Sequence, residues 1–139
     1  MIAMPLKFLT REWIEAYKDV LNNSPDYKEA AKEWEGDFLF VVEPDDKLTE
    51  KIVYYLDLWH GDCRRVDFFK EGDELPETEY QYIGKYSNWL KVINGELDPI
   101  KGILTRQFKL VGNKAKVMRA TKAAKELVNS AQKIDTEFL

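Results

Sequence analysis

Residues 84–134 read GKYSNWLKVINGELDPIKGILTRQFKLVGNKAKVMRATKAAKELVNSAQKI, and this stretch decides the fold. Ser87 stands before an apolar, helix-periodic segment that Gly95 ends, which predicts a first helix. Asp98-Pro99 predicts the start of a short second helix, because proline is favoured at the first helical position. Residues 107–111 alternate between polar and apolar side chains, as a strand does. The stretch holds more apolar surface than such short elements usually need.

The end of this stretch predicts one long helix. Gly112-Asn113 turns the chain, and Asn113 is a suitable N-cap. Because its contact face consists mostly of alanine, we expect this helix to approach a sheet closely. The apolar positions that recur every three or four residues are Val117, Ala120, Ala124, Leu127, Ala131 and Ile134.

Working outward toward the N-terminus, the sequence predicts two more helices and a central strand. Thr10 is an N-cap for an amphipathic helix over 11–22, and Ser24-Pro25 begins a second helix that extends to about residue 34. Residues 38–42, FLFVV, are all apolar, which predicts a strand covered on both faces in the middle of its sheet.

The remaining elements complete one sheet. We expect strands over 51–59, 64–70 and 80–84, with a hairpin turn at His60-Gly61-Asp62. The acidic segment 71–79, EGDELPETE, is expected to be an exposed crossover loop. Strands followed by helices predict an α+β fold of one sheet and one helical layer, in a single domain over residues 1–139.

Charge is distributed unevenly along the chain. Residues 101–134 carry nine Lys or Arg and one acid, or +8, whereas the rest carries twelve basic and twenty-four acidic residues, or −12. Such a basic block can attract an anionic surface, or can simply solvate a helix face and a strand face. The acidic remainder argues against nonspecific nucleic-acid binding. Neither a membrane span nor a secretory signal is expected, and one cysteine permits no intrachain disulfide, so a cytoplasmic location is the default.

The chain contains few residues suited to catalysis or metal binding. Asp57, His60, Asp62 and Cys63 are close in sequence, but zinc needs three or four converging ligands and no second His or Cys exists. A nucleophilic Cys63–His60 pair would need a third group and a pocket, which a hairpin turn does not provide. Nucleophile-elbow, phosphate-loop and dinucleotide motifs are absent from the sequence. We therefore predict no catalytic residues, no metal and no cofactor.

Several of these segments together resemble sterol carrier protein type 2-like domains. The resemblance is strongest over 84–128, where Gly95-Glu96-Leu97-Asp98-Pro99 leads through a short helix and strand to Gly112-Asn113. Asp57-Leu58-Trp59-His60-Gly61 also falls where that family has its second strand, and the resemblance is weak before residue 36. The resemblance implies a five-stranded mixed sheet of order 3-2-1-4-5 with helices mainly on one face. It divides the chain into an N-terminal helical extension, 1–35, and a core, 36–134.

The resemblance further implies noncatalytic binding of a hydrophobic ligand such as a fatty acid, an acyl-CoA or another lipid. The matching cavity positions are Trp89, Leu90, Ile93, Leu97, Ile100, Ile103, Leu104 and Phe108.

Two further hypotheses come from the residues. The basic block predicts transient docking on an anionic membrane surface. Alternatively, the same apolar surface packs against a partner chain or a second copy, which makes the protein an interaction module or homodimer with a filled core. The residues predicted to dock on the anionic membrane surface are Lys109, Lys114, Lys116, Arg119 and Lys122.

Overall fold

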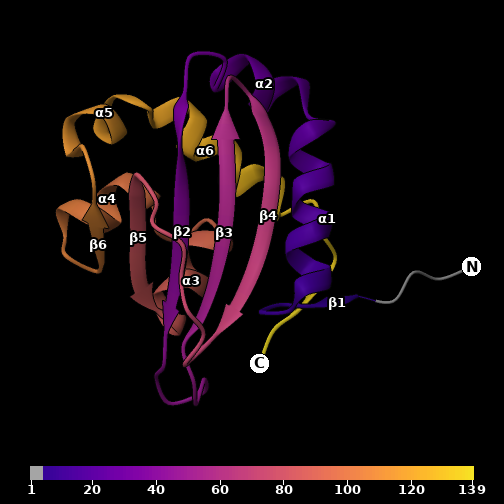
Figure 1. The fold of residues 1–139 in the computed structure, drawn as a ribbon, viewed down its shortest axis with the longest axis vertical. Helices are drawn as coiled ribbons and strands as arrows, with labels where there is room; N and C mark the ends of the chain where they lie inside the picture. The colour runs from indigo at the N-terminus through magenta and orange to yellow at the C-terminus, as the bar shows by residue number, and fades with distance from the viewer. Residues whose placement is uncertain (1–4) are drawn as a thin grey trace, which may run out of the picture.

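The computed structural model describes residues 5–139 and has two layers, a sheet and a set of helices that cover one of its faces (Figure 1). The α+β fold class is therefore confirmed. The elements are β1 Leu6–Lys7, α1 Arg11–Asn22, α2 Pro25–Ala30, β2 Glu35–Glu43, β3 Ile52–Trp59, β4 Asp62–Lys70, β5 Tyr80–Lys85, α3 Tyr86–Ile93, α4 Pro99–Leu104, β6 Phe108–Val111, α5 Lys114–Arg119, α6 Thr121–Ala131 and β7 Thr136–Glu137.

The main sheet has the strand order β4-β3-β2-β5-β6, with β2 in the centre. The pairing of β2 with β5 is parallel, and the other three pairings are antiparallel. When the five strands of this sheet alone are numbered along the chain, the order is 3-2-1-4-5, as predicted. The apolar run of residues 38–42 therefore lies in the central strand.

The central strand is buried on both faces, but by different parts of the molecule. Phe38 and Val42 belong to the large core on the helical side, and Leu39 and Val41 belong to a smaller cluster on the other side. The crossover segment 71–79 supplies Leu75 to this smaller cluster, so its expected exposure is only partly correct. The segment covers the sheet face that has no helices (Figure 1).

Most predicted N-caps are present. The side chains of Thr10, Ser24, Asp98 and Asn113 each accept a hydrogen bond from a backbone N–H in the first turn of the helix that follows. The second helix, however, ends at Ala30 and not near residue 34.

The predicted cap of α3 is wrong. The helix begins at Tyr86, and Lys85 at the N-cap position makes no side-chain hydrogen bond. The Asp45 carboxylate instead accepts a hydrogen bond from the Ser87 N–H at 2.7 Å. Asp45 belongs to the loop between β2 and β3, so the α3 cap depends on tertiary structure and not on the local sequence.

The predicted final helix is broken into two. Ala120, with φ −91° and ψ 41°, separates α5 from α6. Helix α6 makes its main contacts with α1, α2, α3 and α4, so its expected close approach to the sheet is also wrong. Large side chains from the sheet occupy the space between, including Phe38, Phe40 and Tyr82, and they leave the helix standing away from the strands.

A second, two-stranded sheet joins distant parts of the chain. Strand β1 pairs in parallel with β7, with Leu6 opposite Thr136 and Lys7 opposite Glu137. Neither strand was predicted from the sequence. Phe8 follows β1 and packs edge-on against Phe138, with 5.4 Å between ring centroids, so this small sheet closes one end of the core.

Candidate functional site

A cavity of about 110 Å³ lies between the helical face of the sheet and α6. Strands β2, β3 and β5 supply one wall, and the helices supply the other. Its lining residues are Phe8, Trp13, Tyr17, Phe38, Phe40, Val42, Tyr54, Tyr82, Trp89, Val92, Ile93, Pro99, Ile100, Ile103, Val117, Ala124, Leu127, Val128 and Ala131.

The aromatic side chains of this wall direct their polar atoms to partners within the protein. The Tyr82 hydroxyl donates to the Pro99 carbonyl at 2.8 Å, and Trp89 Nε1 donates to the Val41 carbonyl at 2.9 Å. Burial raises the pKa of the Tyr82 hydroxyl, so it stays neutral. The wall therefore offers a ligand hydrocarbon surface and no charge. The remaining hydrogen bonds of this kind join Tyr17 to Leu127, Tyr54 to Thr10 and Trp13 to Thr136.

A smaller apolar cavity, of about 50 Å³, continues from the first beneath α5 and α6. It reaches Tyr27 and Trp34 near α2, so the two cavities follow the sheet from one end of α6 to the other. The side chains that line both are Phe38, Val117, Ala124 and Leu127.

An empty apolar cavity is costly for a small protein. At ~24 cal/mol per Å³, a volume of about 110 Å³ costs ~2.6 kcal/mol. Domains of this size are stable by only ~5–15 kcal/mol. A packing defect of this size therefore weighs heavily against stability unless a ligand fills it.

Four of the eight predicted lipid-binding residues line the main cavity: Trp89, Ile93, Ile100 and Ile103. Three others lie outside its lining. Leu90 and Leu97 are half-buried and pack against the core, whereas the Leu104 side chain is 63% exposed.

Phe108 also lies outside the cavity lining, because it is fixed within the core. Its ring stacks on Tyr82 at 4.3 Å between centroids. A Cβ atom at Gly84 would lie only 2.5 Å from the ring, and one at Gly102 would lie 3.0 Å from it. The absence of side chains at both glycines makes room for the ring.

Much of the cavity wall was not among the predicted residues. Trp13 and Tyr17 come from α1, and Phe8 comes from the segment before it. The signal for Trp13 and Tyr17 in the sequence was the aromatic, amphipathic pattern of residues 11–22, which does not include Phe8. Because that pattern indicates only a buried face, it does not distinguish a core contact from a cavity wall.

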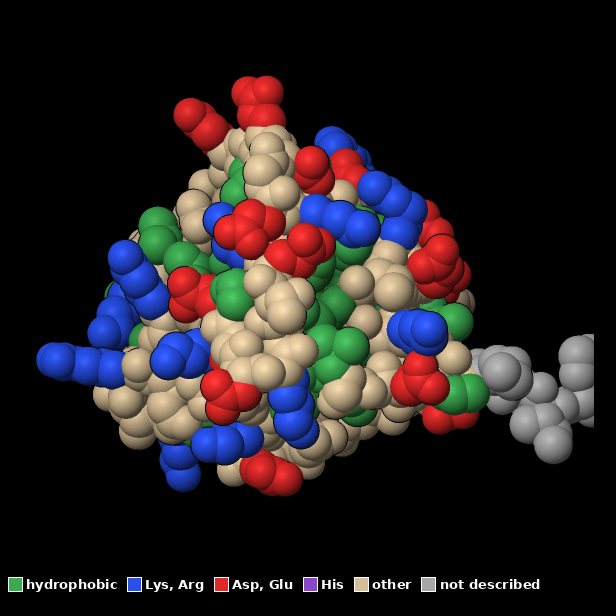
Figure 2. All heavy atoms as spheres, turned by 90° about the horizontal axis from the view of Figure 1, so that it is seen from below, with side chains coloured by type: hydrophobic (Ala, Val, Ile, Leu, Met, Phe, Trp, Pro, Cys, Tyr) green, Lys and Arg blue, Asp and Glu red, His purple; other side chains and the backbone are tan. Residues whose placement is uncertain are grey.

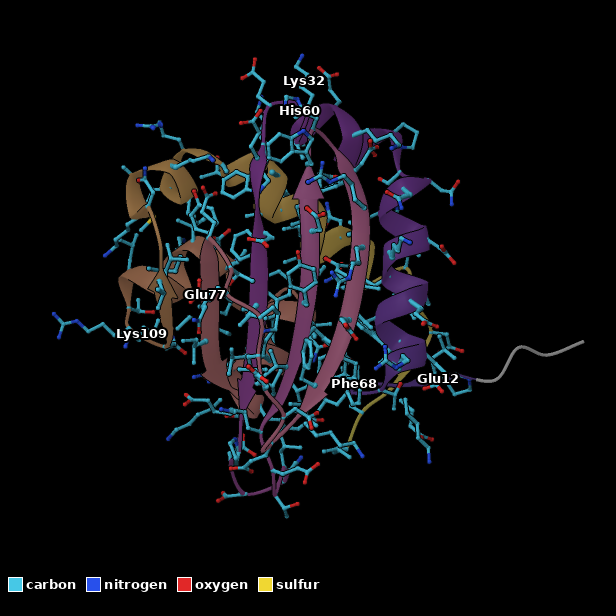
Figure 3. The ribbon with its side chains drawn as sticks, viewed as in Figure 1. Glu12, Lys32, His60, Phe68, Glu77 and Lys109 are labelled. Atoms are coloured by element: carbon cyan, nitrogen blue, oxygen red, sulfur yellow. The ribbon has the colours of Figure 1, made fainter. Side chains whose placement is uncertain are left out.

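The predicted docking residues divide into two groups. Lys109, Lys114, Arg119 and Lys122 are exposed and form no ion pair with any residue in the range 5–139. Lys109 extends away from β6 into solvent (Figure 3). Figure 2 shows cationic side chains gathered on its left, the side where Figure 1 places β6, α4 and α5.

Lys116 belongs to a different environment. Its Nζ lies 4.8 Å from the centre of the Trp34 ring and 5.6 Å from that of Tyr80. It also donates to the Glu35 carbonyl and lies 3.9 Å from Glu79 Oε2. These contacts attach α5 to the sheet, so Lys116 contributes little charge to the exposed surface.

The polar residues near the β3–β4 turn bind separate partners. The Asp57 carboxylate pairs with Arg64, His60 Nε2 lies 2.6 Å from Glu35, and Asp62 pairs with Lys28. Among the described residues, no three His, Cys, Asp or Glu side chains are grouped closely enough to hold a metal ion. None of the helices described is long and apolar enough to cross a membrane.

Comparison with solved structures gives close matches to this architecture. A crystal structure of sterol carrier protein 2 is 30% identical, with a TM-score of 0.80, and the match covers 92% of this chain and 99% of the other. A conserved hypothetical protein from Thermus thermophilus, described as possibly a sterol carrier protein, is 29% identical with a TM-score of 0.84 over 97% and 94% of the two chains.

More distant structures share the fold alone. One is palmitated sterol carrier protein 2-like 2 from Aedes aegypti, at 14% identity and a TM-score of 0.55 over 84% of this chain and 95% of that one. No curated protein sequence matches the chain significantly. Residues 14–125, which make up most of the chain, nevertheless match the SCP-2 sterol transfer family. The chain belongs to the SCP-2 sterol transfer family.

Proposed function

We propose that this protein binds the hydrocarbon part of a lipid in the cavity beneath α6 and carries it without chemical change. The observation that supports this most is the composition of the wall: every lining residue is apolar or aromatic. The wall tyrosines and tryptophans already have hydrogen-bond partners in the protein. Such a site favours alkyl groups by ~0.8 kcal/mol per buried methylene and provides no group for acid–base chemistry.

The relatives support the same function. The two most similar structures described above are a sterol carrier protein and a possible one. A palmitated structure exists for a more distant protein of the same fold. The eight residues expected from the sequence remain proposed contacts. The four that line the cavity, Trp89, Ile93, Ile100 and Ile103, are the strongest candidates.

Filling the cavity tests this proposal. Ala124 lines both cavities, and Ala115 is exposed on α5. We expect Ala124→Phe to abolish binding of the uncharged dye N-phenyl-1-naphthylamine, and with it the displacement of the dye by decan-1-ol, because the new ring occupies the ligand volume. Ala115→Phe adds the same ring outside the cavity and serves as the control. Equal binding by both variants, or no binding by the unmodified protein at micromolar concentration, contradicts the proposal.

We also propose that the basic face docks on an anionic bilayer. Here the basic face means the exposed residues Lys109, Lys114, Arg119 and Lys122. Leu104 at the end of α4, 63% exposed, adds an apolar side chain that can enter the lipid surface. Helix α4 also supplies Ile100 and Ile103 to the cavity, so docking would bring the bilayer next to the cavity wall.

Vesicle sedimentation tests the docking. We expect binding to vesicles in which one third of the lipid is anionic, no binding to phosphatidylcholine vesicles, and loss of binding in high salt. Replacing Lys109 and Lys114 by glutamine should weaken binding about 30-fold, since each basic residue near the surface is worth ~1 kcal/mol. Replacing Lys47 and Lys70 by glutamine is the charge-matched control. Equal losses for both pairs contradict a specific docking face.

An interaction module with a filled core is the less favoured alternative. The apolar side chains that it assigns to a partner, including Trp89, Ile93 and Ile103, are buried within the chain itself. The cavity beneath α6 also argues against a filled core.

A further inference from the structure

A polar groove adjoins the apolar cavity where α3 and α6 both end. The two share Ile93 and Ala131, so these side chains form the partition between them. The groove has a volume of about 680 Å³ and is open to solvent, whereas the cavity is much smaller. Beyond the partition its lining changes to mainly polar residues: Asn94, Gln132, Lys133, Ile134, Asp135, Thr136 and Phe138.

Gln132 connects the two sides of this groove. Its Nε2 donates to the Ile93 carbonyl at 2.8 Å, which ties the end of α6 to the end of α3. A Cβ atom at Gly95 would lie 3.3 Å from the same nitrogen, so the amide rests against a residue without a side chain. Apart from this contact, the Gln132 side chain is exposed to the groove and is available to a ligand.

The electrostatics of the groove favour an uncharged group. Two helix C-termini meet there, and each carries a partial negative charge. The charged side chains of the groove are one cation, Lys133, and one anion, Asp135, which balance each other. A carboxylate therefore gains little binding free energy in the groove, whereas a hydroxyl can donate a hydrogen bond to a helix-end carbonyl and accept one from an amide.

The volume of the main cavity limits how much of a chain it holds. An apolar cavity of ~150 Å³ accepts a six-carbon ring, and the main cavity, at about 110 Å³, is smaller and takes only the end of an alkyl chain. A longer alkyl chain that enters past Ile93 and Ala131 leaves its polar end in the groove.

We propose that the groove between the ends of α3 and α6 is a headgroup site for a single-chain amphiphile with an uncharged hydroxyl, and that Gln132 is the residue that recognises it. This inference rests on the proposed function, because it places the alkyl chain of the same ligand in the cavity.

Three ligands of equal chain length test the headgroup site: decan-1-ol, decanoate and methyl decanoate, each competing with N-phenyl-1-naphthylamine at pH 8. We expect decan-1-ol to bind about fivefold more tightly than either of the others, because only its hydroxyl both donates and accepts without a charge. Fivefold corresponds to ~1 kcal/mol, the usual net contribution of one hydrogen bond. In Gln132→Ala, the affinity for decan-1-ol should fall to that for the ester, and the affinity for the ester should not change. Gln107→Ala, on the segment before β6, is the matched control and should leave all three affinities unchanged.

The possible failures are distinguishable. If none of the three ligands binds, the proposed function fails, and the headgroup site fails with it. If all three bind equally, or Gln132→Ala changes nothing, the headgroup site is wrong and the proposed function stands. Tightest binding by decanoate, lost in Lys133→Gln, overturns the hydroxyl preference and assigns the groove to an anion.

Discussion

Gly84, in strand β5, lies against the ring of Phe108. A Cβ atom there would approach the ring to 2.5 Å, and the ring cannot retreat because it is stacked on Tyr82. We expect Gly84→Ala to lower the free energy of unfolding by ~1–3 kcal/mol, the usual cost of overpacking a core. Urea denaturation measures this change. Gly72→Ala provides a comparison, because nothing lies within 4 Å of its Cβ position. Since φ is +93° at Gly72, that variant reports backbone strain without the steric clash.

Cys63 is expected to be unreactive in the folded protein. Burial raises the pKa of its thiol to about 12, and the side chain is 1% exposed. Because the thiolate is the reactive form, the native protein should resist a thiol reagent such as iodoacetamide at pH 8 for hours. The urea-unfolded protein should react within minutes. Rapid modification of the native state, measured by mass spectrometry, would contradict this prediction and would indicate frequent local opening around β4.

The residue scale also shows how far single positions could be read from the sequence. Thr10 and Asn113 were predicted as caps and are caps, because a capping side chain reaches only to the next turn. Phe108 was predicted as a cavity contact, and in the structure its ring lies outside the cavity lining, so the contact stays a prediction. Its place depends on Gly84 and Gly102, which come together only in the fold. Contacts within one helical turn could be predicted from the local sequence, whereas contacts between distant segments depend on packing in the folded protein.

At the scale of elements, α3 depends on the β2–β3 loop. The Asp45 carboxylate accepts hydrogen bonds from the N–H groups of Lys47, Ser87 and Leu48, and these bonds hold its pKa below the ordinary value. A carboxyl whose native pKa is lowered stabilises the fold fully above its unfolded pKa, about 3.9, and loses this stabilisation as the pH falls through the native pKa.

Replacement of Asp45 by asparagine tests this long-range cap. Because asparagine keeps an acceptor oxygen but removes the charge, we expect Asp45→Asn to lower the free energy of unfolding at pH 7 by ~0.3–1 kcal/mol, the usual contribution of an anion at a helix N-terminus. The difference from the unmodified protein should shrink below about pH 4. Asp46→Asn removes the same charge from the neighbouring exposed position and is the control. A constant difference from pH 7 to pH 3 would mean that the carboxylate charge is not involved.

Elements also differ in how well the sequence predicted them. The helix predicted over residues 11–22 has the same bounds as α1, because the Thr10 cap and the helical periodicity indicate the same start. The break at Ala120 has no signal, since alanine is a good helix former and the apolar spacing continues through it. Strands β1 and β7 have two residues each, too few for any period to appear.

At the scale of the whole molecule, the cavity connects ligand binding to stability. A ligand that binds only the folded state adds ~2.7 kcal/mol at 100 times its Kd. For a domain of this length, that gain corresponds to a rise in Tm of roughly 10 °C. We therefore expect decan-1-ol to raise the Tm of the unmodified protein, measured by circular dichroism, and to leave that of Ala124→Phe unchanged. A similar rise in both would show that the alcohol binds elsewhere.

The sheet order and the family were predictable, and the resemblance implied a cavity, but most of the residues that border it were not predictable. Alternation and turn residues along 38–84 give the strands, and the resemblance over 84–128 gives their order. A cavity, however, is a volume that several elements leave unfilled. Phe8, Phe40 and Ala131 border the same space from three distant segments, and no local pattern shows that they do not touch.

The pairing of β1 with β7 has a consequence for how the protein is made on the ribosome. Phe8 forms part of the cavity wall and packs against Phe138, so residues 8 and 138 must meet before that end of the cavity closes. The chain is synthesised from the N-terminus, and the sheet strands up to Val111 emerge before Thr136 does. Until residues 136–138 have emerged, that end of the cavity lacks part of its wall. The wall can therefore be completed only after the whole segment from Phe8 to Phe138 has been synthesised.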